Sequence, residues 1–161
     1  MHLFLDIDGV LNCERDWRVP YSINSNCLNV FAKLIKELEK RERVEVVLIS
    51  TWRAGLGDGK GNLNPVDKLM KELKILGIMV EGCTPMSDKG RQAEVEFYIR
   101  RNKIRNYIIL DDDSSLYSDI DAVRLYVVDH KTGLQEADIK KITKCFRKQV
   151  CLNSVFKRFW H

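Results

Sequence analysis

Two aspartates, Asp6 and Asp8, stand two residues apart where an apolar run from Met1 to Ile7 ends. The run predicts a buried strand, and two carboxylates at its end repel one another and are costly to remove from water. A divalent cation would relieve this repulsion, and Mg2+ is usually held by one or two carboxylates together with water and substrate phosphate. Gly9 then permits a sharp turn away from such a site. An ordinary Asp-Gly turn after a strand is the alternative explanation.

Further polar clusters follow later apolar runs: Ser50 and Thr51 after Val44–Ile49, and Asp111, Asp112 and Asp113 after Tyr107–Leu110. Three consecutive aspartates would cost stability unless a cation neutralised them. Lys89 is predicted in the first turn of a helix that begins at Ser87 or Asp88, where a cation opposes the helix dipole. Both placements are explained if a metal ion and a phosphate share one pocket.

The elements that must position these residues alternate along the chain. Short apolar runs predict strands over residues 1–7, 44–49, 78–80, 107–110 and 125–128. Helical periodicity predicts helices over about 26–41, 65–76 and 88–102, and a last long helix whose inner face carries Ile139, Ile142 and Phe146. The glycine-rich stretch 54–63 is predicted as a loop. This order indicates an α/β fold with a parallel sheet covered by helices, and a site where the carboxyl ends of the strands converge.

Length and composition narrow the class of protein. A chain of 161 residues is expected to form one domain, residues 1–161, and the apolar fraction of 45% is ordinary for a globular protein. No apolar run is long enough to cross a bilayer and no cleavable leader is evident, so no membrane partner is expected. The five cysteines are odd in number and never spaced CxxC, which favours reduced thiols and a cytoplasmic location.

The C-terminal part is basic. Residues 131–161 carry eight lysines and arginines against two acidic residues, a net charge of +6. A basic helix and tail over about 135–161 could guide a polyanion to an acidic site, although a solvated helix face explains the same charges. Residues 148–161 alternate basic and apolar groups. They predict either a short helix that packs its apolar side or a nucleic-acid contact.

Taken together, the clusters resemble the four motifs of the haloacid dehalogenase (HAD) superfamily, which consists largely of phosphatases. The matching residues are Asp6-Ile7-Asp8-Gly9-Val10, Ser50 after Val46–Ile49, Lys89, and Asp111-Asp112. The stretches DIDGVLN, ISTWR, ILDDD and HKTGLQEAD more narrowly resemble the HAD domain of Swiss Army Knife RNA repair proteins, from residue 3 to about 146. The resemblance implies a three-layer, Rossmann-like HAD fold. Its cap is minimal here, because only short segments separate the motifs.

The resemblance also implies a mechanism. Asp6 would attack phosphorus to form an aspartyl-phosphate, and Asp8 would protonate the leaving oxygen and then deprotonate the hydrolytic water. Ser50 and Lys89 would hold the phosphoryl oxygens and stabilise their charge in the transition state.

A Mg2+ cofactor belongs to this mechanism. Its implied ligands are Asp6, the backbone carbonyl of Asp8, and Asp112. The last motif departs from the common GDxxxD form, so the choice among the three aspartates stays open, with Asp112 favoured and Asp111 second. Further substrate contacts are expected from backbone groups of Gly9 and Thr51, and from the Arg53 guanidinium, whose planar fork suits a phosphate.

Three functions compete at this stage. A site with a minimal cap stays open to large substrates, so the first is a phosphatase of a nucleotide or of an RNA or DNA end. The second applies the same chemistry to a small metabolite or a phosphoprotein. The third is a catalytically idle HAD fold that only binds, which the presence of both Asp6 and Asp8 disfavours. Trp52 could stack a base or belong to the core. No obligate protein partner is evident.

Overall fold

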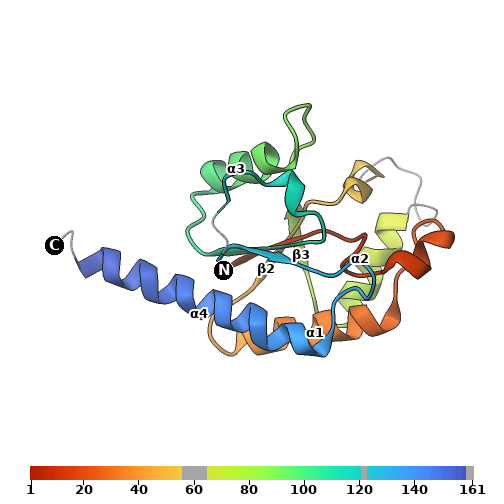
Figure 1. Cartoon of the computed structure of the whole chain (residues 1–161), viewed down its shortest axis with the longest axis horizontal. Helices are drawn as coiled ribbons and strands as arrows, with labels where there is room; N and C mark the ends of the chain where they lie inside the picture. The colour runs from red at the N-terminus through yellow and green to blue at the C-terminus, as the bar shows by residue number, and fades with distance from the viewer. Residues whose placement is uncertain (56–64, 121–122, 159–161) are drawn as a thin grey trace.

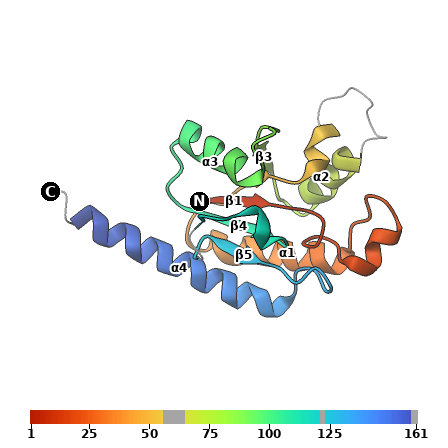
Figure 2. The ribbon, with the colours of Figure 1, turned by 45° about the horizontal axis from the view of Figure 1, so that its top comes forward.

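The structure, a computed structural model, describes residues 1–55, 65–120 and 123–158, and from residue 148 onward only the backbone is described. The strands of this part form one five-stranded sheet in the order β3-β2-β1-β4-β5, and every neighbouring pair is parallel. The strands are β1 (His2–Leu5), β2 (Glu45–Leu48), β3 (Val80–Cys83), β4 (Tyr107–Asp111) and β5 (Leu125–Val127). The prediction of a Rossmann-like α/β fold is therefore confirmed (Figure 2).

The register of the sheet brings three strand ends level with one another. Leu5 at the end of β1 pairs with Leu48 of β2 on one side and with Leu110 of β4 on the other. The residues that come next are Asp6, Ile49 and Asp111. We call this side of the sheet, where β1, β2 and β4 end, the carboxyl edge.

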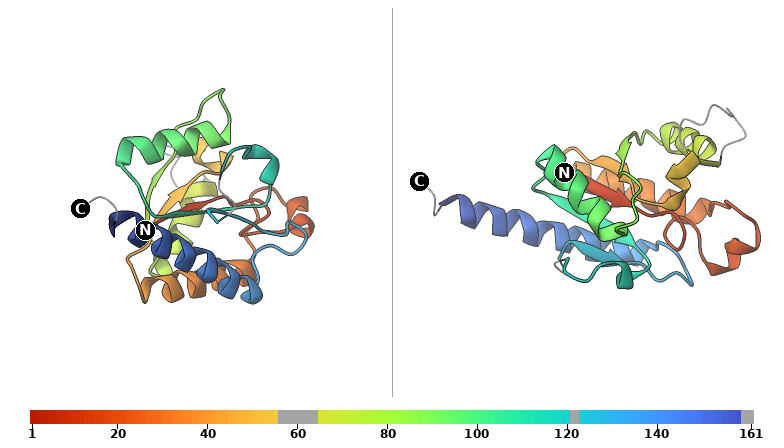
Figure 3. Two further views of the ribbon diagram at one scale, coloured as in Figure 1. Left: turned by 60° about the vertical axis from the view of Figure 1, so that its left-hand side comes forward. Right: turned by 90° about the horizontal axis from the view of Figure 1, so that it is seen from above.

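Helices cover both faces of the sheet. They are α1 (Ser25–Glu39), α2 (Pro65–Ile75), α3 (Arg91–Asn102) and α4 (Glu136–Arg158). Leu3 and Leu5 point into the larger core, which includes residues of α1, α2 and α4, whereas Phe4 points into a smaller core beside α3. Figure 3 (left) shows the sheet between these two layers. Because both faces are covered, β1 is apolar from Leu3 to Leu5 instead of alternating with polar residues.

The boundaries of two elements differ from the sequence predictions by three residues or more. Helix α3 begins at Arg91, three to four residues later than predicted, because Gly90 has a φ of +86° and a helix cannot continue through that conformation. Strand β3 begins at Val80 and runs to Cys83, so only the last residue of the predicted strand 78–80 belongs to it. Of the predicted glycine-rich loop 54–63, residues 54 and 55 end a short 3-10 helix, η2 (Thr51–Gly55). The rest lies outside the described residues.

The segment between β1 and α1 contains the 3-10 helix η1 (Glu14–Arg18). The 3-10 helix η4 (Ser114–Leu116) follows β4. Helix α4 starts beside the loop after β1, where the Leu134 N–H donates to the Val10 carbonyl at 3.0 Å. It then extends well beyond the sheet toward the C-terminus (Figure 1). None of the described helices is both long and apolar enough to cross a membrane.

Candidate active site

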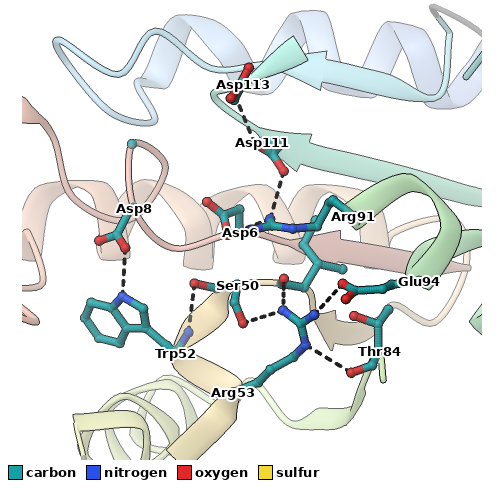
Figure 4. A network of polar contacts seen from close by, with 12 residues as sticks. Asp6, Asp8, Ser50, Trp52, Arg53, Thr84, Arg91, Glu94, Asp111 and Asp113 are labelled. Atoms are coloured by element: carbon teal, nitrogen blue, oxygen red, sulfur yellow. Dashed lines mark hydrogen bonds and ion pairs between the residues drawn. The ribbon is translucent and has the colours of Figure 1, made fainter. Parts of the chain in front are cut away.

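Asp6 lies at the centre of the carboxyl edge, directly after β1, with 6% of its surface exposed. Its Oδ1 accepts a hydrogen bond from Arg91 Nη1 at 2.9 Å, and the same Nη1 donates to Asp111 Oδ2 at 3.0 Å (Figure 4). Burial raises the pKa of Asp6 to about 7; Arg91 opposes this shift, while the charges of Asp111 and Asp112 add to it. The three carboxylates of Asp6, Asp111 and Asp112 thus lie beside a single guanidinium, that of Arg91.

Three carboxylates of the described residues lie close enough to share a metal ion. Asp6, Asp111 and Asp112 each offer an oxygen within 4.8 Å of the others. Asp111 is buried and also accepts a hydrogen bond from the Tyr117 hydroxyl at 2.7 Å. Asp112 is half-buried, and burial together with the Asp111 charge raises its pKa. Such an all-oxygen set suits a hard divalent cation.

Asp113 has a different role from its two neighbours. It is exposed and caps η4, because its Oδ1 accepts hydrogen bonds from Ser115 N at 2.9 Å and from Ser115 Oγ at 2.6 Å. This capping explains the third aspartate without a cation. Asp111 and Asp112, the two candidates that the sequence ranked highest, are the ones that lie beside Asp6.

Gly9 allows the loop after β1 to approach Asp112 closely. A Cβ on Gly9 would lie 2.3 Å from the Asp112 Cγ, and the φ of +72° independently favours glycine. The expected role of its backbone N–H in holding the substrate stays a prediction, although this N–H already has a partner in the protein. That N–H donates to Asn12 Oδ1 at 2.9 Å and so is already used.

The carboxylate of Asp8 is held apart from the acidic cluster by two donors. Asn12 Nδ2 donates to its Oδ1 at 2.9 Å. Trp52 Nε1 donates to its Oδ2, also at 2.9 Å (Figure 4). The expected metal contact through the Asp8 backbone carbonyl stays a prediction. Trp52 is 6% exposed, so it is largely buried as the core alternative expected, and its indole N–H orients Asp8. The sequence pattern did not reveal this link between β1 and η2.

Ser50 and Thr51 follow β2 as predicted, but they differ in exposure. Ser50 is 1% exposed and its Oγ lies 3.4 Å from the Trp52 backbone nitrogen. Because β1 and β2 are adjacent and in register, Ser50 lies at the same edge as Asp6 (Figure 4). Thr51 is exposed and opens η2, so its predicted backbone contact with a substrate stays a prediction.

The prediction that Arg53 binds the substrate is not supported by its position. The side chain is buried and its donors are occupied by other groups of the protein. Nε donates to the Thr84 carbonyl at 3.0 Å, Nη1 to the carbonyls of Ile49 and Ser50, and Nη2 to the Pro85 carbonyl and Glu94. Arg53 therefore ties the end of β2 to the loop after β3 and to α3.

Lys89 also differs from its predicted place. It is exposed in the loop before α3, with its backbone N–H 3.3 Å from Ser87 Oγ, and not in the first helical turn. Arg91, the first residue of α3, is the cation that reaches Asp6. The sequence analysis missed Arg91. The glycine at position 90 was the available signal, because it indicates a later start for the helix.

Comparison with known proteins agrees with this architecture. Residues 2–139 match the family described as the HAD domain in Swiss Army Knife RNA repair proteins. No curated protein and no solved structure matches the chain. The matched range includes the whole sheet and every residue of the site described above. The chain therefore belongs to the family of HAD domains found in Swiss Army Knife RNA repair proteins.

Proposed function

We propose that this protein is a Mg2+-dependent phosphomonoesterase that acts through an aspartyl-phosphate on Asp6. The observation that carries the proposal is the arrangement around Asp6. A buried carboxylate lies beside a guanidinium and two further carboxylates, with a second, separately oriented aspartate two residues away. Family membership supports phosphatase chemistry and a substrate related to nucleic acid. We therefore propose a nucleotide or the phosphorylated end of an RNA or DNA strand.

The residues present fit the proposed metal ion. Asp6, Asp111 and Asp112 would supply oxygen ligands from two adjacent strands, and the pKa of Asp6 is raised first by its burial and then by the charges of the other two aspartates, which a cation would offset. Asp111 and Asp112, together with Asp6, would hold the ion. When bound, Mg2+ would reduce the repulsion between the carboxylates and the incoming phosphate.

The two aspartates of the first motif would divide the chemistry. An oxygen of Asp6 attacks phosphorus, and the bond from phosphorus to the leaving oxygen breaks as that oxygen takes a proton from Asp8. Asp8 then removes a proton from the water that attacks the aspartyl-phosphate, which releases inorganic phosphate and regenerates Asp6. The donors Asn12 and Trp52 fix the direction in which Asp8 gives and takes the proton.

Arg91 is the described cation best placed to bind the phosphoryl group. Its Nη1 makes both ion pairs, to Asp6 and Asp111, and the guanidinium carries further N–H donors in a planar fork. Ser50, buried at the same edge, would add a hydroxyl donor. Lys89 stays a second candidate from the loop that precedes Arg91.

A screen of phosphorylated compounds tests this function. The substrates are 3′- and 5′-phosphorylated oligonucleotides, mononucleotides, glycerol phosphate and a phosphopeptide, each with Mg2+ and with EDTA. We expect Mg2+-dependent release of phosphate, fastest from nucleotides or oligonucleotides. Faster turnover of the phosphopeptide or glycerol phosphate would favour the second function. The absence of turnover on every compound would favour an idle binding module.

A further inference from the structure

A pocket of about 480 Å3 opens beside Asp8, and none of Asp6, Asp111 and Asp112 is among its lining residues. It lies between the β1–α1 segment and the start of η2, and its volume is in the range of small-ligand sites. The residues that line it include Asp8, Asn12, Trp17, Pro20, Tyr21 and Trp52. Three of its seven lining residues are thus aromatic, and the proposed general acid is another.

The aromatic side chains present accessible ring surface to this pocket. Trp17 is 43% exposed and Tyr21 is 59% exposed, so both rings are accessible to a ligand. The Tyr21 ring stands edge-on to the Trp52 ring, with centroids 5.1 Å apart. The Trp17 ring stacks on His130, with centroids 6.0 Å apart. These contacts hold the rings in fixed positions.

The backbone that carries these rings is also tied down. Oδ2 of Asp16 accepts hydrogen bonds from the backbone N–H of Cys13 at 3.0 Å and from Asn24 Nδ2 at 2.9 Å, which closes the β1–α1 segment on itself. Tyr21 has a φ of +56°, a conformation that an aromatic residue rarely adopts. The pocket is therefore formed before any ligand binds.

The side-chain polar groups of Asn12, Trp17 and Trp52 in the wall are already used within the protein. Asn12 donates to Asp8 and to the Ser22 carbonyl, and its Oδ1 accepts from Gly9 N and from Trp17 Nε1. The Trp52 indole N–H is taken by Asp8. These groups have no donor or acceptor left to form a hydrogen bond with the polar edge of a base, whereas the ring surfaces stay accessible.

We propose that this pocket binds the terminal nucleoside of the substrate, with its base stacked on Trp17 and Tyr21 and without selection among bases. The inference rests on the proposed function, in which Asp8 protonates the leaving oxygen. The group attached to that oxygen must then lie next to Asp8, where this pocket is. Stacking is tolerant of base identity because every base has a π-face.

A consequence follows for the strand end that is accepted. A base that enters this pocket is surrounded by side chains of the protein and cannot remain paired with a complementary base. The terminal nucleotide must therefore be unpaired, so single-stranded or frayed ends are the substrates and a blunt duplex end is a poor one.

Tyr21 offers the cleanest test, because its side chain makes no hydrogen bond to Asp8 or Asn12 among the described contacts. Tyr21→Ala is compared with Tyr21→Phe, which keeps the ring, and with Phe97→Ala, which removes an exposed ring on α3. We expect Tyr21→Ala to lower kcat/KM about tenfold on a single-stranded oligonucleotide with a terminal phosphate. Tyr21→Phe and Phe97→Ala should stay near wild type.

Two further substrates distinguish a contact with the base from a contact with the phosphate. The wild type should prefer the natural oligonucleotide over one with an abasic terminal nucleotide, and Tyr21→Ala should lose more turnover on the natural oligonucleotide than on glycerol phosphate. Equal turnover of natural and abasic ends by the wild type would overturn the proposal. So would an equal loss on glycerol phosphate, which would make Tyr21 only structural, or full activity of Tyr21→Ala on the natural end.

A binding measurement keeps the pocket testable if no phosphoester is hydrolysed. That result would contradict the proposed function and not the pocket. Adenosine and cytidine should then still quench the tryptophan fluorescence of the wild type saturably, and more weakly in Tyr21→Ala. An absence of saturable quenching would overturn the nucleoside pocket.

Discussion

At the scale of single residues, two neighbouring aspartates of the same motif have different environments. Asp6 is buried among Arg91, Asp111 and Asp112, whereas the carboxylate of Asp8 is oriented by an amide and an indole beside an aromatic pocket. The nucleophile must react as a carboxylate, whereas the general acid must carry a proton. The two aspartates therefore need different environments.

The aspartates after β4 give a first prediction. Asp112→Asn should raise the Mg2+ concentration needed for half-maximal activity at least about tenfold, because it removes a charged ligand from the cluster. Asp113→Asn is the matched control, since asparagine also caps helices and Asp113 lies outside the cluster. Titration of activity with Mg2+ measures both variants. Equal effects of the two substitutions would contradict the assignment of Asp112.

The pair Lys89 and Arg91 gives a second prediction. Arg91→Ala should lower kcat/KM by about a hundredfold or more, because it removes the cation that contacts Asp6 and is placed to stabilise phosphoryl charge. Lys89→Ala should cost much less, since Lys89 is exposed in the preceding loop. Steady-state kinetics on a mononucleotide compare the two. The opposite ranking would restore the role that the sequence assigned to Lys89.

At the scale of elements, the contacts of Arg53 join β2, the loop after β3, and α3. The Arg53–Glu94 ion pair is buried on both sides, with side chains 3% and 7% exposed. Removal of one partner from such a pair leaves an unpaired buried charge. Arg53 thus contributes to the site indirectly, by holding the carbonyl of Ser50 and the loop that leads to Arg91.

This arrangement gives a third prediction. Arg53→Ala should lower the free energy of unfolding by about 3–5 kcal/mol, as measured by urea denaturation. Arg43→Ala is the matched control, because Arg43 pairs with Glu81 at the surface at 2.9 Å and such pairs contribute about 0–1 kcal/mol. If Arg53→Ala were as stable as Arg43→Ala and only raised KM, Arg53 would be a substrate ligand after all.

The order of strands and helices could be predicted because hydrophobic periodicity depends on local sequence. β1, β2 and β4 each contain an apolar run of three or four residues without alternation, since they are buried on both faces. Their polar successors could therefore be placed at one edge. The start of α3 could not be predicted as well, because one backbone conformation at Gly90 decided it.

The parts of the site that the sequence did not reveal depend on where long side chains point. Arg53 follows Ser50 closely in sequence, yet its guanidinium turns into the protein and reaches Glu94. Arg91 reaches Asp6 across the sheet edge, and Trp52 reaches Asp8 from another element. Such contacts link residues about 40 to 85 positions apart, and no local pattern encodes them.

At the scale of the whole molecule, α4 carries the basic C-terminal part away from the carboxyl edge. Its first turn lies near the loop after β1, and its 23 residues span about 35 Å (Figure 1). The side chains predicted to contact nucleic acid, in residues 148–161, lie outside the described side chains. A substrate could reach both the active site and this tail only if it were a polynucleotide of several residues.

This geometry gives a fourth prediction. The pair Lys157→Glu and Arg158→Glu should weaken the affinity for long oligonucleotides and flatten its dependence on salt, because fewer phosphate contacts release fewer counterions. Turnover of a mononucleotide should stay unchanged, and binding titrations at several salt concentrations provide the measurement. An equal loss on both substrates would indicate misfolding. No loss on either would leave the tail as a solvated surface.

The central claim is that Asp6 becomes phosphorylated during turnover, and the most direct test is to trap that intermediate. The protein is mixed with Mg2+ and a phosphoester whose leaving group needs no protonation, quenched in acid, and analysed by peptide mass spectrometry. Wild type should carry one phosphoryl group on the peptide that contains Asp6, and Asp8→Asn should accumulate it because hydrolysis lacks its base. Asp6→Asn should carry none and show no turnover. Full turnover by Asp6→Asn, or a phosphoryl group on another residue, would contradict the account.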